Sequence, residues 1–211
     1  MRMSSLVLAA LMVIMSLMIQ DLSPKRVEAG GGGAPQWATF TLPNIQVNPG
    51  TKYIDVPVQA TSTPVDGVDV VIQYDPTVLR LVDMDNSRPG VQAVMGNCPL
   101  PWVLHNDAPW EGAGEKGGPA TDKIYVSAGR AFYPNAPVQL NCTLATLRFV
   151  PLTKGTSALI LVPQIFDKYG VPVNDGTLAA NNGQKLPLEL INGQVTVGRP
   201  NSGKNNNDRR K

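Results

Sequence analysis

Short runs of alternating apolar and polar residues fill the chain between residues 36 and 198, and Pro, Gly, Asn and Asp interrupt them repeatedly. The runs are rich in Val, Ile, Leu and Thr, which favour strands, and none has the long 3.6-residue period of an amphipathic helix. They predict strands at residues 37–42, 53–60, 68–74, 78–84, 123–128, 144–150, 157–162 and 194–197. We therefore expect an all-β fold in which two sheets pack against each other.

The alternation is clearest in residues 68–74 and 123–128. Side chains two residues apart in a strand point to the same face of the sheet. We expect the core to contain Val68, Val70, Ile72 and Tyr74 from the first strand and Ile124, Val126 and Ala128 from the second. The opposite face then carries Asp69, Val71 and Gln73 beside Lys123, Tyr125 and Ser127. Such a mixed face can bind a partner, although an ordinary solvated sheet face has the same composition.

The strand pattern stops between residues 87 and 122, which are rich in Pro and Gly. This stretch contains Cys98, Trp102, Trp110 and His105, the only histidine of the chain. It predicts either a long structured loop or short strands with irregular connections, and binding residues are common in such loops.

The two ends of the chain differ from its middle. Residues 1–29 have the pattern of a secretory signal, because Arg2 precedes an apolar run at residues 6–19 and small residues near Ala29 favour cleavage. An uncleaved N-terminal anchor is the alternative, although the run is shorter than the roughly 20 residues that span a bilayer. We interpret residues 30–35 as a Gly-rich linker, 36–198 as one domain and 199–211 as a disordered basic tail. The sequence thus predicts a protein that is secreted or at the cell surface.

Export bears on the two cysteines, Cys98 and Cys142. An oxidising compartment favours a disulfide between them, and two buried free thiols are the alternative, because the sequence does not give the distance between their Cα atoms.

The charge argues against nucleic acid as a ligand. The formal net charge of +2 is unevenly distributed, since residues 1–29 and 199–211 hold eight of the 18 Lys and Arg but three of the 16 Asp and Glu. The expected domain is left with 10 cationic and 13 acidic residues, a net charge near −3. A phosphate-binding surface needs clustered cations, and here they cluster in the tail.

Reactive groups for catalysis are few. With His105 as the only imidazole and no Gly-x-Ser-x-Gly segment, a Ser–His nucleophile pair has little support. The two cysteines and His105 lack the spacing of a zinc site, and residues 167–170 are typical of a turn rather than a calcium loop. No spacing favours a glycosidase pair among the carboxylates Asp107, Glu111, Glu115 and Asp122. We expect a protein that is not an enzyme and has no cofactor and no metal.

Residues 67–81 carry a resemblance to a known family. Their sequence, Gly-Val-Asp-Val-Val-Ile-Gln-Tyr-Asp-Pro-Thr-Val-Leu-Arg-Leu, resembles the segment of cohesin domains in which a strand ends in Tyr-Asp-Pro and the chain resumes with Val-Leu. Tyr74 closes a buried strand, Asp75 can bond backbone amides in the turn, and Pro76 stops the strand. Similar pieces follow the family's order over about residues 38–198: Pro49-Gly50 before residues 54–58, the strand at 144–149, and Asn192-Gly193 before the last strand.

The resemblance implies a sandwich of jelly-roll type with about nine strands, whose outer sheet face binds a dockerin module. In that family the calcium belongs to the dockerin, and an acidic residue before Tyr-Asp-Pro accepts hydrogen bonds from it. Asp69 occupies the matching position here. Val71, Gln73, Tyr125 and Ser127 join it as candidate partner-binding residues through the alternation alone.

Two other functions fit the same fold. A carbohydrate-binding module would bind polysaccharide through exposed rings, for which Trp102 and Trp110 are the candidates, whereas Trp37 is expected to pack. A surface structural domain would keep the fold without either ligand.

Overall fold

The computed structural model describes residues 35–198 except 86, 89, 109–121 and 131–135. The expected signal, the linker up to residue 34, the basic tail and Trp110 lie outside the described residues. Within them, every regular element is a strand, and no helix is long and apolar enough to cross a bilayer.

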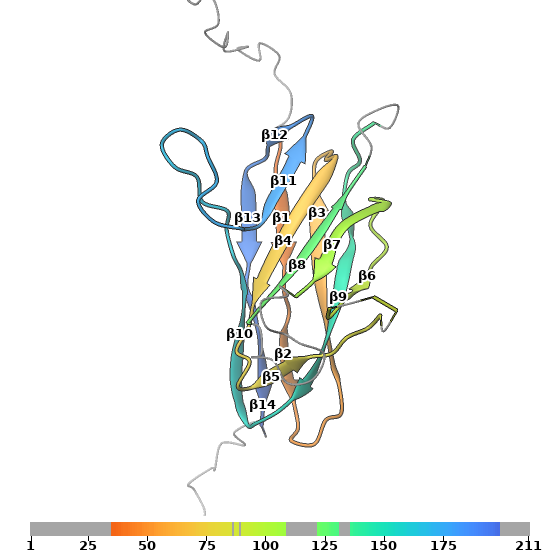
Figure 1. The fold of residues 1–211 in the computed structure, drawn as a ribbon, viewed down its shortest axis with the longest axis vertical. Coiled ribbons are helices and arrows are strands. Elements are labelled where there is room, and N and C mark those ends of the chain that lie inside the picture. The colour runs from red at the N-terminus through yellow and green to blue at the C-terminus, as the bar shows by residue number, and fades with distance from the viewer. Residues whose placement is uncertain (1–34, 86, 89, 109–121, 131–135, 199–211) are drawn as a thin grey trace, which may run out of the picture. The chain divides into compact units, whose positions relative to one another are not determined.

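Two sheets pack face to face (Figure 1). The β3–β9 sheet has the order β13-β1-β3-β9-β5, with β6 also paired to β9. Its strands are β1 (Ala38–Thr41), β3 (Ile54–Ser62), β5 (Leu79–Leu81), β6 (Val94–Met95), β9 (Asn141–Pro151) and β13 (Leu188–Ile191).

The β4–β8 sheet has the order β12-β11-β4-β10-β14-β2, and β8 pairs with β4 and with β7. Its strands are β2 (Asn44–Val47), β4 (Gly67–Gln73), β7 (Trp102–Asp107), β8 (Lys123–Gly129), β10 (Gly155–Leu161), β11 (Leu178–Asn181), β12 (Gln184–Lys185) and β14 (Gly193–Val197). The predicted all-β sandwich is confirmed. Most pairs are antiparallel, and β1 with β13 and β2 with β14 are parallel.

Two neighbouring segments cross together from one sheet to the other. β1 continues into β2 through Leu42 and Pro43, and β13 continues into β14 through Asn192. The amide of Leu42 donates to the carbonyl of Ile191 at 2.9 Å, so the crossing segments stay in contact. A Cβ at Gly193 would lie 2.2 Å from the Pro43 carbonyl oxygen. Only glycine therefore permits this close approach.

The core takes the residues that the alternation predicts. Val68, Val70, Ile72, Tyr74, Ile124, Val126 and Ala128 are all buried between the sheets. The ring of Tyr74 packs edge to face against Phe149 of β9, with centroids 5.0 Å apart. This contact joins the residue that follows β4 in one sheet to β9 in the other.

The Tyr-Asp-Pro turn follows the expected chemistry. The Asp75 carboxylate accepts hydrogen bonds from the amide of Thr77 at 2.8 Å and from its hydroxyl at 2.6 Å. These bonds lower the pKa of Asp75, with the hydroxyl as the largest cause. The chain then re-enters the core at Leu79 and forms β5, which is shorter than the predicted strand because Asp83 begins a turn by accepting from the amide of Asp85.

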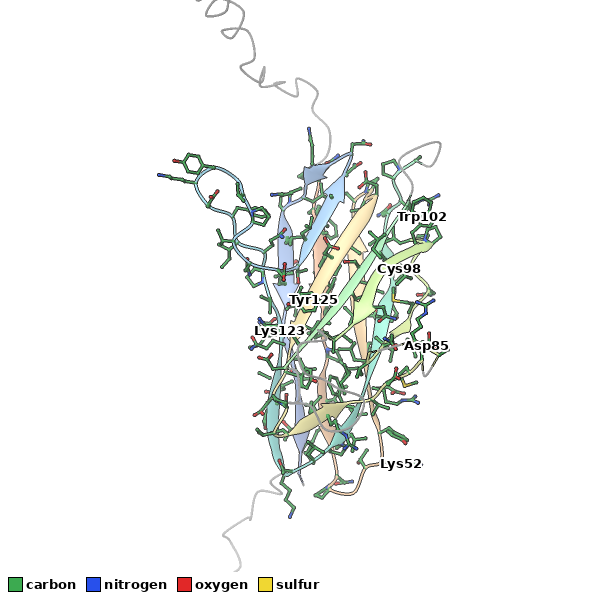
Figure 2. All side chains as sticks on the ribbon, viewed as in Figure 1. Lys52, Asp85, Cys98, Trp102, Lys123 and Tyr125 are labelled. Carbon is green, nitrogen blue, oxygen red and sulfur yellow. A yellow bond between two sulfur atoms is a disulfide. The ribbon has the colours of Figure 1, made fainter. Side chains whose placement is uncertain are left out.

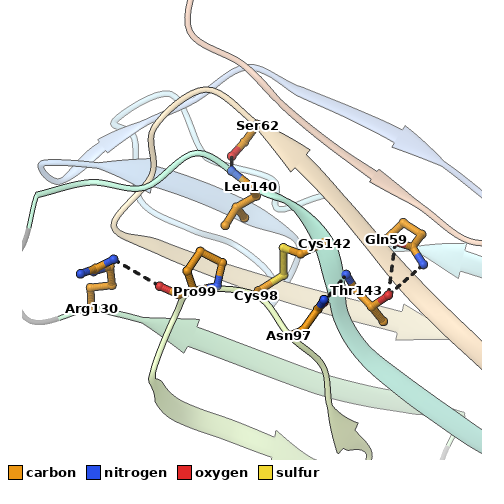
Figure 3. The surroundings of a disulfide bond; sticks show 9 residues. All are labelled: Gln59, Ser62, Asn97, Cys98, Pro99, Arg130, Leu140, Cys142 and Thr143. Carbon is orange, nitrogen blue, oxygen red and sulfur yellow. Dashed lines mark hydrogen bonds between the residues drawn. A yellow bond between two sulfur atoms is a disulfide. The ribbon is translucent and has the colours of Figure 1, made fainter.

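The irregular region holds two short strands, β6 and β7, and a disulfide fastens it to β9 (Figure 3). Cys98 and Cys142 are bonded, with their Cα atoms 5.2 Å apart. Beside them, the amide of Asn97 donates to the Thr143 carbonyl at 3.0 Å, and the Asn97 side chain accepts from the Thr143 amide at 3.1 Å. The region is thus held to the β3–β9 sheet by covalent and hydrogen bonds.

Removing the disulfide should destabilise the domain. The bond links two cysteines that are 44 positions apart in the sequence, so it closes a long loop and limits the conformations of the unfolded chain. We expect Cys98→Ala/Cys142→Ala to lower the free energy of unfolding by about 2–4 kcal/mol in urea titrations. Wild-type protein reduced with dithiothreitol should show the same loss, and an unchanged midpoint in both would contradict the prediction.

Candidate functional site

The outer face of the β4–β8 sheet brings the predicted site residues together. Asp69 lies opposite Ser127, Val71 opposite Tyr125, and Gln73 opposite Lys123 in the β4–β8 pairing. Residues directly opposite each other point to the same side of a sheet. On the other side of β4, the row continues to Leu178 of β11 beside Asp69 and to Ile160 of β10 beside Gln73. Figure 2 shows Lys123 and Tyr125 on β8.

Val71 is not available for contact, which corrects the expectation from alternation. Its exposed fraction is 2%. It lies where β4 changes partner from β11 to β10, and the residues that flank those strands meet it there. The Val162 amide donates to the Val71 carbonyl at 2.9 Å, and the Thr177 hydroxyl accepts from the Val71 amide at 3.2 Å. Alternation gives the face of a residue but not what covers that face.

Ser127 is also buried, with an exposed fraction of 8%, rather than open to a partner. Its hydroxyl donates to the carboxylate of Asp69, which is itself half-buried. A carboxylate has about four acceptor positions, so Asp69 keeps further capacity toward the outside. Ser127 therefore orients Asp69, and the Asp69 carboxylate is the more exposed member of the pair.

Below this pair, Gln73 and Tyr125 belong to a second polar group. The Gln73 side-chain amide donates to Asp122 at 2.7 Å. Burial raises the pKa of the Tyr125 phenol, and the negative charges of Asp175 and Asp122 raise it further. The alternation does not assign either carboxylate to this face: Asp122 directly precedes β8, and the fold brings Asp175 here from the connection between β10 and β11.

The two tryptophans that the structure describes lie on different sheets and do not form a row of rings. Trp102, at the start of β7, is 55% exposed at the margin of the outer face (Figure 2). Trp37 is 40% exposed, not packed as expected, and lies next to β1 in the other sheet. The described residues thus offer no planar platform of the kind that polysaccharide binding uses.

The described residues include no candidate metal site, and Asp167 has a structural role in a turn. No group of three or more His, Cys, Asp or Glu side chains among these residues could hold a metal ion. Asp167 accepts from the amides of Tyr169 and Val171 at 2.8 and 2.9 Å, so it shapes a turn.

Solved structures of cohesin domains have a similar fold. The type I cohesin of the Coh-OlpC–Doc435 complex from Clostridium thermocellum has a TM-score of 0.55 and 8% identity over 81% of this chain and 99% of that one. A type II cohesin domain from Acetivibrio cellulolyticus has a TM-score of 0.52 and 19% identity over 77% and 95% of the two chains. The seventh ScaB type I cohesin of Pseudobacteroides cellulosolvens has a TM-score of 0.52 and 16% identity over 78% and 94%.

The chain has a cohesin-like fold. This confirms the fold implied by the Tyr-Asp-Pro segment, and identities this low establish the fold alone. No protein-family model matches the sequence, and no curated protein does. In this cohesin-like fold β7 lies on one side of the β4–β8 pair, and residues 162–177, which connect β10 to β11, meet β4 on its other side.

Thr177 should matter for stability through its hydroxyl. Thr177→Val keeps the shape of the side chain but leaves the buried Val71 amide without its acceptor, which costs about 1–3 kcal/mol. Urea unfolding should detect this loss. The matched control Thr61→Val, at an exposed position of β3, should change the free energy of unfolding by less than about 0.5 kcal/mol. Equal values for the two variants would contradict the role of the hydroxyl.

The raised pKa of Tyr125 predicts an alkaline pH dependence. The folded state favours the neutral phenol, so this stabilisation is complete below the unfolded pKa, about 10, and is lost as the pH rises through the folded pKa. Wild-type protein should therefore lose stability relative to Tyr125→Phe above pH 10. Urea titrations of both proteins between pH 8 and 11 measure the difference between their free energies of unfolding. The contributions of the other tyrosines cancel because both proteins contain them. A difference that does not change with pH would refute the shift.

Proposed function

We propose that residues 36–198 form a non-catalytic protein-binding domain whose partner is a dockerin-type module, bound on the outer face of the β4–β8 sheet. The observation that carries this proposal is the half-buried Asp69 carboxylate in the middle of that face, oriented by Ser127. The fold supports it as well. Two structures with a similar fold are described as complexes with dockerins, the one from C. thermocellum and the third ScaC cohesin of A. cellulolyticus, which has a TM-score of 0.50.

The chemistry of the face suits a protein partner. A carboxylate that accepts hydrogen bonds from a partner's hydroxyl or cationic groups makes stronger bonds than a neutral acceptor does. Tyr125 adds an aromatic side chain, a residue type that is enriched at protein interfaces. Because Asp69 is already held by Ser127, little side-chain freedom is lost on binding.

The proposal includes the compartment and the calcium. The disulfide between Cys98 and Cys142 fits an oxidising environment, as export through the signal at residues 1–29 would provide. Calcium belongs to the partner in this proposal, so binding should require calcium for the dockerin and none for this chain.

Asp69→Ala tests the proposal. The full-length chain is immobilised and probed with calcium-loaded dockerin modules from its own organism, expressed one by one, by biolayer interferometry. We expect at least one dockerin to bind, and the substitution to weaken that binding about 10- to 100-fold, because a central charged residue of an interface is lost.

Two controls separate binding from folding. Asp55→Ala changes an exposed carboxylate on the β3–β9 sheet, where Asp55 pairs with Arg148, and it should leave binding unchanged. Asp69→Ala/Ser127→Ala removes the buried hydroxyl together with its acceptor and should bind as weakly as the single variant. Wild-type affinity in a folded Asp69→Ala protein would refute the proposed face.

A further inference from the structure

A loop between β10 and β11 exposes four large apolar side chains. This excursion, residues 163–176, leaves the edge of the β4–β8 sheet and projects from the body of the sandwich (Figure 1). It exposes Ile165 (56%), Tyr169 (78%), Val171 (55%) and Val173 (59%). Apolar patches that stay open on a folded domain mark interaction surfaces.

The excursion is held in shape by its own hydrogen bonds. The Val173 amide donates to the Ile165 carbonyl at 2.9 Å, and the Asn174 side chain accepts from the Ile165 amide at 2.6 Å. A Cβ at Gly176 would lie 2.4 Å from the Cα of Gln164, so the two legs of the loop touch. The exposed apolar side chains therefore belong to a loop whose conformation is fixed by internal hydrogen bonds.

The base of the excursion adjoins the outer face of the sheet. Asp175 lies close enough to Tyr125 for its charge to act on the phenol, and Thr177 bonds the backbone of Val71. Leu178, the first residue of β11, lies opposite Asp69. A partner that covers Asp69 and Tyr125 would therefore meet the base of the loop as well.

The charges next to the excursion define what such a partner must carry. Asp122 and Asp175 lie close enough to Tyr125 for their charges to act on its phenol, and Asp69, opposite Ser127, adds a third carboxylate to the same face. A Lys or Arg side chain at this place would gain from the carboxylates and from the face of the tyrosine ring. Apolar side chains beside it would cover the exposed residues of the loop.

We propose that the excursion is a second part of the same binding surface, and that its partner presents apolar side chains to Ile165 and Val173 next to a Lys or Arg that meets Asp175. The inference rests on the proposed function, because the occupant is the same dockerin-type partner. It adds a contact outside the strands of the sheet and a charge that the partner must have.

Surface variants of the full-length chain test the inference with the dockerin that binds the wild type. We expect Ile165→Ser/Val173→Ser to weaken binding about tenfold and to leave the melting temperature unchanged, since both side chains are exposed. Asp175→Asn should weaken binding and reduce its dependence on salt. The matched control is Leu152→Ser/Ile191→Ser, which changes two similarly exposed apolar residues, one at the end of β13 and one directly after β9. It should bind like the wild type.

A photo-crosslinker at Tyr169 gives a direct readout, because it should join the dockerin covalently, whereas one at Tyr53 should not. Loss of binding in Asp69→Ala with wild-type affinity in all excursion variants would overturn this inference and leave the proposed function standing. Binding by no dockerin would overturn both. Self-association of the wild type that the double serine variant abolishes, measured by light scattering, would assign the loop to a second copy of the chain and also overturn the inference.

Discussion

The antiparallel pairing of β4 with β8 sets both the core and the candidate site. Its register runs from Gly67 opposite Gly129 to Gln73 opposite Lys123. This places Val70 and Val126 in the core, where a fully buried aliphatic side chain contributes about 1.5–3 kcal/mol. A slip of one residue would turn the Asp69 side of β4 inward. The packing of the hydrophobic core therefore fixes which residues lie together on the outer face of the sheet.

β4 changes partner from β11 to β10 along one of its edges, and this change shapes the polar face there. β10 and β11 each pair with part of β4, and Val71 lies between the two paired parts. Its backbone groups are satisfied by Val162 and Thr177 rather than by a continuous strand. The cost of a buried unpaired amide holds residues 162–177 against the sheet at this point. The same constraint buries Val71 and brings Asp175 beside Tyr125.

The opposite margin of the face is closed differently. Among the described strands β7 pairs with β8 alone, and its register shifts between Val103 and His105. A bulge of this kind twists an edge strand and disfavours pairing with another chain. The Asn106 side chain also bonds Ala93 on both its donor and acceptor sides, at 2.7 and 3.0 Å. The two bonds hold β7 to the segment before Cys98, which the disulfide anchors to β9.

The sequence by itself determined the strands and turns that a few adjacent residues specify. Alternation identified β4 and β8 and their buried side chains, and Tyr74, Asp75 and Pro76 identified the turn and the cohesin-like fold. It did not locate β2, β6, β11, β12 and β13, because strands of two to four residues carry few alternating positions, nor β7, which lies in the Pro- and Gly-rich region where the pattern stops. The burial of Val71, the position of Asp175 and the crossing at Gly193 depend on segments far apart in the chain. Only the tertiary structure decided these, since which segment covers a sheet face depends on long-range packing that no local pattern contains.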